Sequence, residues 1–222
     1  MNPYYINSPQ QGEWNQSDHQ AVQKTVFQPC YFRILYLSDA NLDIDCYCDG
    51  VLFASNLKHS HALNYLQMNP GYHQLSIERN ADGKKQVLLR QDILLIPTEY
   101  MTLCVVEKNQ GIQLYAIIDE VYPIKDKIQK LRIINFTTQQ QLQGELAQKI
   151  VVKNLNPLEM TPYINVYDNE REVLKITCPM RGDEHLTFEE VDFSKSIIQT
   201  IYIIEDRQTN RVSMLKLKDG VL

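Results

Sequence analysis

Apolar and polar residues alternate along several short stretches of the chain, with the period of two that is typical of β-strands. The clearest stretch is 42–49, where Leu, Ile, Cys and Cys alternate with Asp, Asp, Tyr and Asp. The dipeptide Asp49-Gly50 ends this stretch and is a strong signal for a two-residue hairpin turn. Further turn signals recur roughly every ten residues, without a convincing amphipathic helix between them. This pattern predicts an all-β protein of the antiparallel sandwich type, in which residues 139–149 form an edge strand or a loop.

The chain contains an internal repeat. Residues 32–35, Phe-Arg-Ile-Leu, recur as residues 131–134, Leu-Arg-Ile-Ile, at an offset of 131 − 32 = 99. Other pairs keep an offset of 98 to 100: Tyr65 with Tyr163, Leu75 with Leu174, and Asp119 with Asp219. Self-similarity at a fixed period indicates a duplicated structural unit. We predict an N-terminal polar arm at 1–29, a first sandwich at 30–120, a linker at 121–129 and a second sandwich at 130–222, with about seven strands in each sandwich.

One charged residue recurs inside an apolar strand of each repeat. Arg33 and Arg132 hold equivalent positions between apolar neighbours. Successive side chains of a strand point to opposite faces, so Phe32, Ile34 and their counterparts in the second repeat are expected to face the core. The two guanidinium groups are then expected to reach the surface or a carboxylate.

Two segments of the first repeat resemble a known family. Residues 32–38 (FRILYLS) and 45–50 (DCYCDG) are similar to the pattern VRVVHASPDAPAVDVYVDG of the bacterial domain of unknown function 4397. The family histidine is Tyr36 here, and its Pro-Asp pair is Asp39-Ala40. The resemblance implies two tandem antiparallel immunoglobulin-like β-sandwich domains and no established activity. It also implies a place in a spore or cell-surface layer.

Composition and charge exclude several classes of partner. The net charge is −5 and the 22 Lys and Arg residues are scattered, so a nucleic-acid partner is not expected. No apolar run approaches the roughly 20 residues that a membrane helix needs. The first residues lack the charged and apolar regions of a secretory signal peptide. We therefore expect synthesis in the cytoplasm without a signal peptide, and no membrane span.

The five cysteines are expected to be thiols, because an odd number without an export signal argues against a disulfide framework. Cys46 and Cys48 share one face of their strand with apolar residues. The second repeat has Leu142, Gly144 and Leu146 at the matching places. Cys46 and Cys48 are therefore interpreted as buried core residues rather than a metal or redox pair.

The histidines are the candidate metal ligands. His59 and His61 lie two residues apart, which places them on one face of a strand, and His73 on a later strand is a third candidate. The more ordinary interpretation is that they are solvated polar residues, so neither a bound metal nor another cofactor is expected. No catalytic motif is present in the sequence, and the protein is not expected to be an enzyme.

The N-terminal arm carries the candidate interaction residues. Tyr4, Tyr5 and Trp14, the only tryptophan of the chain, lie among polar residues within 1–29. One interpretation is a disordered tail. The other is an arm that docks through its aromatic side chains onto a neighbouring copy or onto its own sandwich.

These features favour a non-catalytic structural or interaction protein that acts through protein–protein contacts or self-assembly. An alternative is a module that binds a carbohydrate or another surface polymer, with stacking faces supplied by Tyr47, Tyr65, Tyr72 or Tyr115. The third hypothesis is a metal-dependent enzyme that uses His59 and His61.

Overall fold

The computed structural model describes residues 28–38, 43–81, 83–108, 111–121, 128–138, 141–146, 149–167, 172–177, 185–191, 198–206 and 211–220. Within these ranges the chain forms seventeen strands and no helix, which confirms the all-β prediction. The described ranges accordingly contain no helix that could cross a membrane. Most of the predicted arm, residues 1–27, lies outside them.

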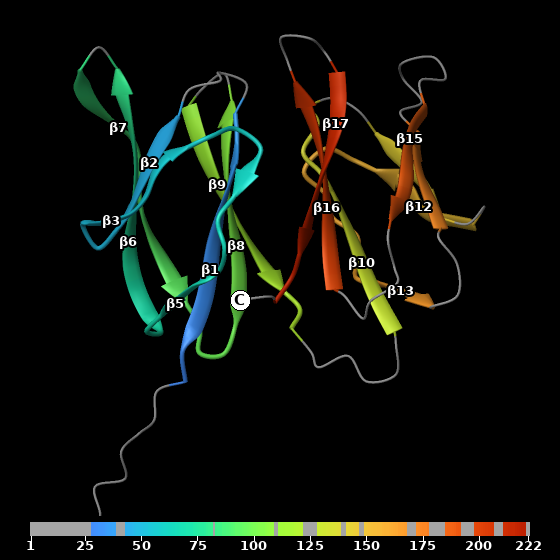
Figure 1. Ribbon diagram of the computed structural model, residues 1–222, viewed down its shortest axis with the longest axis horizontal. Coiled ribbons are helices and arrows are strands. Elements are labelled where there is room, and N and C mark those ends of the chain that lie inside the picture. The colour runs from blue at the N-terminus through green and yellow to red at the C-terminus, as the bar shows by residue number, and fades with distance from the viewer. Residues whose placement is uncertain are drawn as a thin grey trace, which may run out of the picture.

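The first half of the chain forms two sheets, coloured blue to green in Figure 1. Its strands are β1 (Cys30–Leu37), β2 (Ile44–Cys48), β3 (Val51–Leu57), β4 (His61–Ala62), β5 (Leu66–Met68), β6 (Gly71–Ala81), β7 (Lys84–Leu95), β8 (Tyr100–Lys108) and β9 (Gly111–Asp119). One sheet has the order β4-β1-β8-β9, with β5 also paired to β1, and the other has the order β3-β2-β6-β7.

The second half repeats this arrangement. Its strands are β10 (Ile128–Asn135), β11 (Leu142–Leu146), β12 (Lys149–Leu155), β13 (Ile164–Tyr167), β14 (Glu172–Thr177), β15 (His185–Val191), β16 (Ile198–Asp206) and β17 (Arg211–Lys218). The two sheets have the orders β13-β10-β16-β17 and β12-β11-β14-β15. The matching strand orders support the internal duplication inferred from the sequence.

Two details of the strand pattern differ from the prediction. The halves have nine and eight described strands rather than about seven, since short strands such as β4 also pair. In addition, β1 pairs with β8 in parallel, and β10 pairs with β16 in parallel. The antiparallel expectation is wrong for these pairs, because their strands are joined by long crossovers through the other sheet and not by hairpins.

Within the stretch 139–149, interpreted as an edge strand or loop, the described strand β11 is an inner strand. β11 lies between β12 and β14, so the expectation of an edge is wrong. Gly144, at its centre, weakens the strand signal in the sequence. A Cβ at Gly144 would lie 3.2 Å from the Cβ of Val152 on β12, so the missing side chain allows this close packing.

Each pair of sheets encloses an apolar core. In the first sandwich the core includes Phe32 and Ile34 of β1 and Cys46 and Cys48 of β2. The equivalent residues of the second sandwich are buried in its core as well, which confirms the predicted strand faces. Cys30, Cys46, Cys48 and Cys104 are free thiols, as expected, whereas Cys178 lies outside the described residues.

The predicted hairpin turn joins β2 to β3. Asp49 and Gly50 have φ angles of 51° and 78°, and the flanking Cys48 and Val51 are paired. Two consecutive positive φ angles are characteristic of the type I′ turn, which Asp-Gly favours. The sequence therefore predicted the position of this turn correctly.

A third apolar cluster lies between the two sandwiches. It joins the sheet of β1, β8 and β9 to the sheet of β10, β16 and β17. The molecule is thus four sheets deep, with these two sheets facing each other at its centre (Figure 1). The outer face of β1 is consequently covered, so both faces of that strand are buried.

The buried thiols are expected to react slowly in the native protein. Burial, together with the negative charge of Asp45, raises the pKa of Cys46 to about 12, and burial with Asp49 raises that of Cys48 to about 11. In a Cys178→Ser variant, labelling by a thiol reagent at neutral pH should be about 100-fold slower or more than in urea, because the thiolate is the reactive form. Rapid native labelling of Cys46 or Cys48 would contradict this core assignment.

Candidate functional site

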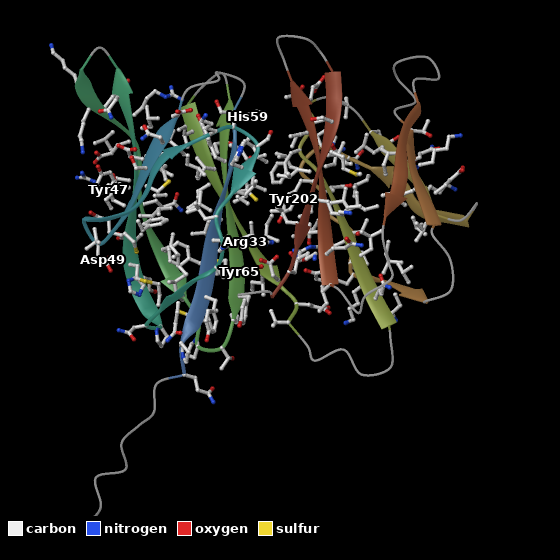
Figure 2. All side chains as sticks on the ribbon, in the orientation of Figure 1. Arg33, Tyr47, Asp49, His59, Tyr65 and Tyr202 are labelled. Atoms are coloured by element: carbon white, nitrogen blue, oxygen red, sulfur yellow. The ribbon has the colours of Figure 1, made fainter. Side chains whose placement is uncertain are left out.

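The alternation of β1 directs one arginine away from the core and toward the second sandwich. Phe32 and Ile34 point into the first core, so Arg33 between them faces the opposite way. Its side chain is only 5% exposed, because Lys218 and Asp219 of the second sandwich and the ring of Tyr65 lie against it (Figure 2). A buried guanidinium needs partners for its charge and its N–H groups.

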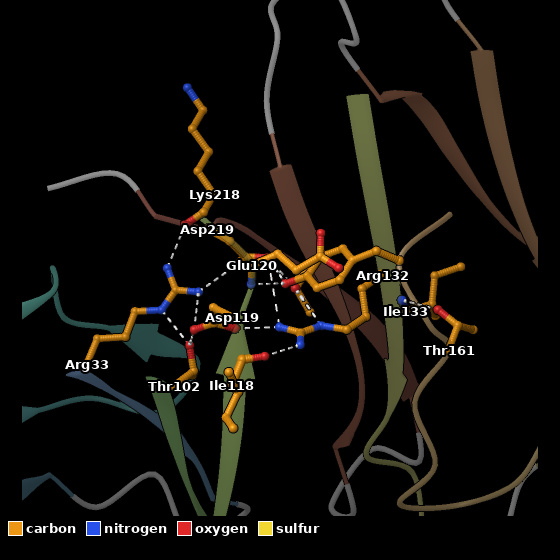
Figure 3. Close-up of polar contacts among 12 residues, drawn as sticks. Arg33, Thr102, Ile118, Asp119, Glu120, Arg132, Ile133, Thr161, Lys218 and Asp219 are labelled. Atoms are coloured by element: carbon orange, nitrogen blue, oxygen red, sulfur yellow. Dashed lines mark hydrogen bonds and ion pairs between the residues drawn. The ribbon is translucent and has the colours of Figure 1, made fainter. Parts of the chain in front are cut away.

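Arg33 finds these partners on both sandwiches. Its Nε donates to Thr102 Oγ1 of its own sandwich at 2.8 Å. On the second sandwich, Nη1 donates to the Lys218 carbonyl at 2.7 Å and Nη2 donates to Asp219 Oδ1 at 2.7 Å. Figure 3 shows these contacts converging from β1, β8 and the end of β17.

Arg132 makes the same set of contacts in the opposite direction. Its Nε donates to Thr200 Oγ1 at 3.0 Å, on its own sandwich. On the first sandwich, Nη1 donates to the Ile118 carbonyl at 2.7 Å and Nη2 donates to Asp119 Oδ1 at 2.5 Å. The partners of Arg132 are thus the repeat equivalents of the partners of Arg33, exchanged between the sandwiches (Figure 3).

The two carboxylates complete the network. Asp119 Oδ2 accepts hydrogen bonds from Tyr65 Oη at 2.7 Å and from Thr102 Oγ1 at 2.5 Å. Asp219 Oδ2 accepts the equivalent bonds from Tyr163 Oη at 2.9 Å and from Thr200 Oγ1 at 2.5 Å. Each carboxylate therefore has a tyrosine and a threonine of its own sandwich and an arginine of the other.

Each tyrosine also stacks on the arginine of its own sandwich. The guanidinium carbon lies 4.4 Å from the ring centroid both for Arg33 over Tyr65 and for Arg132 over Tyr163. A cation over an aromatic face is stabilised by the ring quadrupole, more strongly when both are desolvated. The stack fixes the plane of each guanidinium so that its Nη1 and Nη2 donors point toward the other sandwich.

The network balances its charges in a dry environment. Two arginines face two aspartates, whose side chains are 0% exposed. Burial, with the nearby charge of Asp119, raises the pKa of Asp219 to about 6. Burial alone would lower the pKa of Arg33, but Tyr65 and the two carboxylates outweigh it and raise that pKa. Such charges are tolerated in the interior only when all are paired.

Apolar side chains surround the network. Leu35 and Leu37 of β1 pack in one cluster with Ile134, Tyr202 and Ile204 of the other sandwich. The hydroxyl of Tyr202 is buried and has no hydrogen-bond partner among the described residues. The surrounding contacts exclude water from the ion pairs and so strengthen them.

A close contact also links the ends of the two sandwiches. Gly220 has a φ of 68°, and a Cβ there would lie 2.7 Å from the side chain of Val121. Glycine is required at this position for both reasons. The residues just beyond the two aspartates therefore touch directly.

The arrangement is suited to holding two sandwiches together rather than to chemistry on a bound molecule. Its carboxylates have no exposed surface, and each is already occupied by three donors. A general acid or base needs access to its substrate. We therefore refer to Arg33, Arg132, Asp119, Asp219 and their threonine and tyrosine partners as the crossed joint.

The sequence-predicted site residues do not take part in the crossed joint. Tyr4, Tyr5 and Trp14 lie outside the described residues. His59 Nδ1 accepts a hydrogen bond from the Ser38 amide at 2.8 Å, and exposed His61 contacts the His59 carbonyl at 2.9 Å.

The structure does not bring the three candidate histidines together. Among the described residues, the side chains close enough to hold a metal jointly are Cys48, Asp49 and His73. His73 is therefore separated from the pair at His59 and His61, and its partners are a cysteine and an aspartate. The expectation from the sequence that no metal binds at these three histidines stays a prediction.

The four tyrosines considered for polymer binding have different environments. Tyr65 is buried in the crossed joint, and Tyr115 packs on Phe136 between the sandwiches with ring centroids 5.7 Å apart. Tyr47 is half-buried beneath Lys85, whereas Tyr72 is 79% exposed. Only Tyr72 offers an open ring face to a ligand.

Sequence reasoning anticipated the arginines but not their partners. It expected Arg33 and Arg132 to reach the surface or a carboxylate, and both reach buried carboxylates. It matched Asp119 with Asp219 without pairing them with the arginines. The available signal was that polar residues stay identical at the repeat offset, as Thr102 and Thr200 also do.

Comparison with known proteins identifies one family. A family model described as Domain of unknown function (DUF4397) matches residues 31–142, which is half of the chain. The match covers the first sandwich and ends at the start of β11. A search of curated proteins found no match.

Replacing one arginine should destabilise the whole protein. In Arg33→Met the Asp219 carboxylate stays buried, loses its 2.7 Å ion pair and keeps only the longer one to Arg132 at 3.9 Å, which should lower the free energy of unfolding by about 3–5 kcal/mol. Urea unfolding of the full chain, followed by circular dichroism, measures this loss. The matched control is Arg90→Met, since Arg90 is an exposed arginine of β7 and its loss should change stability by less than about 0.5 kcal/mol.

A double variant separates loss of the pair from loss of packing. Arg33→Met with Asp219→Leu removes both charges and should recover part of the loss, because no unpaired charge stays buried. Equal stability of Arg33→Met and wild type would contradict the described ion pair.

Proposed function

This chain belongs to the family described as Domain of unknown function (DUF4397), and because that description assigns no activity we propose a function from the geometry of the molecule. The protein is a non-catalytic structural or interaction protein that acts through protein–protein contacts or self-assembly. The observation that carries this proposal is the crossed joint. The polar residues common to both repeats hold the sandwiches together and leave the outer faces and strand edges for partners.

The joint favours a rigid body over two independent domains. Each arginine is anchored in one sandwich by a threonine and a tyrosine and bound in the other by a carboxylate and a carbonyl. Separating the sandwiches would expose four charges and the apolar cluster around them. A rigid unit with fixed outer surfaces suits a structural or assembly role.

Strand β7 supports a role in protein contacts. It is twelve residues long and forms one edge of its sheet, with β6 as its one partner among the described strands. Its apolar residues Val87 and Leu94 are 48% and 47% exposed. A long edge strand with exposed apolar residues is a favourable site for strand addition by another chain.

The N-terminal arm is the proposed second element of assembly. A polar segment that carries the aromatic residues Tyr4, Tyr5 and Trp14 suits docking on an open sheet edge of a neighbouring copy. A repeated contact of this kind would build a layer, in keeping with the proposed place in a spore or cell surface.

Removal of the arm should weaken self-association while both sandwiches stay folded. Trp14→Ala should cost on the order of 2 kcal/mol, which corresponds to roughly 30-fold weaker association. Light scattering and sedimentation of the full chain, the 30–222 fragment and Trp14→Ala measure this change. Trp14→Phe is the control that retains an aromatic ring and should lose less.

Trp14 fluorescence provides an independent readout of docking. A docked indole emits at shorter wavelength than a hydrated one. Hydrated emission at assembly concentrations, together with no change of particle size on truncation, would contradict docking of the arm.

Binding of a surface polymer is the second candidate function, favoured by exposed Tyr72. Tyr72 on β6 is paired with Leu94 on β7, which is also exposed, so the two form an apolar strip on the outer face of their sheet. An open aromatic face next to an apolar side chain suits stacking of a sugar ring.

Tyr72→Ala should then weaken binding to a polysaccharide by about tenfold, since one aromatic anchor contributes on the order of 1–2 kcal/mol. A pull-down with insoluble glucan, chitin and peptidoglycan tests it, with Tyr115→Ala as the control that removes a ring packed between the sandwiches. No retention of the wild-type protein on any of these would rule out binding to them.

A further inference from the structure

A group of potential metal ligands lies at one end of the first sandwich, at the turn between β2 and β3 and the start of β6. One donor atom from each of Cys48, Asp49 and His73 lies within 4.8 Å of the others. Figure 2 places Asp49 on the outer side of the first sandwich, far from Arg33 and the crossed joint. We propose that Cys48, Asp49 and His73 form a binding site for Zn²⁺.

The local backbone fixes the aspartate. Asp49 is the first residue of the type I′ turn, and its Oδ1 accepts a hydrogen bond from the Gln74 amide at 2.8 Å. The Asp49 amide donates in return to the Gln74 carbonyl at 2.9 Å. These bonds hold Oδ2 toward His73, so the carboxylate needs little reorganisation to bind a cation.

His73 has the surroundings of a metal-binding histidine. Its Nδ1 lies 2.7 Å from Asp49 Oδ2, and its Nε2 lies 2.8 Å from the Asn69 carbonyl. A cation between Nδ1 and Oδ2 replaces the proton held there. Nε2–H then donates to the Asn69 carbonyl, the outer contact that orients most metal-bound histidines.

Cys48 supplies the third ligand from the inner face of the sandwich. Sulfur, nitrogen and oxygen donors together suit Zn²⁺, which binds Cys, His and Asp with bonds of about 2.0–2.3 Å. Two donors on one tetrahedral zinc are therefore about 3.3–3.8 Å apart. Asp49 Oδ2 and His73 Nδ1, now 2.7 Å apart, need to open by roughly 0.6 Å to admit the ion, and Cys48 Sγ, within 4.8 Å of both, needs to move by at most roughly 1 Å. The thiol loses its proton to solvent when the Zn–S bond forms.

The second repeat indicates that packing alone does not require a thiol here. Cys48 pairs with Leu75, and Leu146 pairs with Leu174, so Leu146 is the structural equivalent of Cys48. Leu146 is buried in the second core. The first repeat alone therefore combines a thiol, a carboxylate and an imidazole at this end, and the 49% exposed side chain of Asp49 leaves a path for the ion.

Titration of the untagged, metal-free full chain with Co²⁺, followed by competition with Zn²⁺, tests the proposal. We expect one Co²⁺ per chain, a thiolate-to-metal band in the near ultraviolet, visible bands of tetrahedral intensity, and displacement by one Zn²⁺. Cys48→Ser should abolish the ultraviolet band, and His73→Gln should weaken binding at least about tenfold.

Two further variants guard against misfolding and nonspecific binding. Asp49→Asn keeps an acceptor for the Gln74 amide and tolerates the positive φ, so the variant should fold normally. Its affinity for Zn²⁺ should nevertheless be at least about tenfold lower than that of the wild type. His61→Gln changes an exposed histidine outside the cluster and should bind as the wild type does. No stoichiometric band in the wild type, or unchanged affinity in both His73→Gln and Asp49→Asn, would overturn the proposal.

Discussion

Two buried arginines and two buried aspartates, exchanged between the halves of the chain, hold this molecule together. A charge buried without a partner is strongly destabilising, whereas a fully paired set is tolerated. Neither sandwich supplies such a set alone, since each arginine makes its short ion pair with the aspartate of the other sandwich and lies 3.9 Å from the aspartate of its own. The covering of the central sheets, the burial of both faces of β1 and the exclusion of water from the joint follow from this requirement.

The crossed joint also explains why some polar residues are identical in the two repeats while residues elsewhere differ. The arginine, threonine, tyrosine and aspartate of the joint are identical in type in both. Away from the joint the repeats diverge, as with Cys48 and its equivalent Leu146. The proposed zinc site and exposed Tyr72 belong to the first repeat, so we infer that the repeats share a structural role and that ligand binding is confined to the first.

Local and periodic features of the sequence predicted much of the fold. The alternation in residues 42–49 located a strand and its inner face, and Asp49-Gly50 located the hairpin. The repeat offset led to two sandwiches with matching strand orders. Parallel pairing of β1 with β8 was missed, because strand direction depends on the path of the chain between them and leaves no periodic signal.

The site was less predictable, for a related reason. Alternation places Arg33 on the face opposite the core but does not say what covers it. Its partner Asp219 is 186 residues away in sequence. The histidine pair at His59 and His61 drew attention through its spacing, whereas His73 meets Cys48 and Asp49 only through strand pairing. Spacing in one strand reveals a shared face, but sites built from several strands emerge only with the sheet register.

Coupling between the two sandwiches is the central claim, and amide hydrogen exchange of the wild type and Arg33→Met tests it most directly. The account predicts that amides of β1 and β8 in the first sandwich and of β10 and β16 in the second exchange through one common opening. Arg33→Met should therefore lower their protection by the same factor in both sandwiches. Loss of protection in the first sandwich alone, with β10 and β16 as protected as in the wild type, would contradict it.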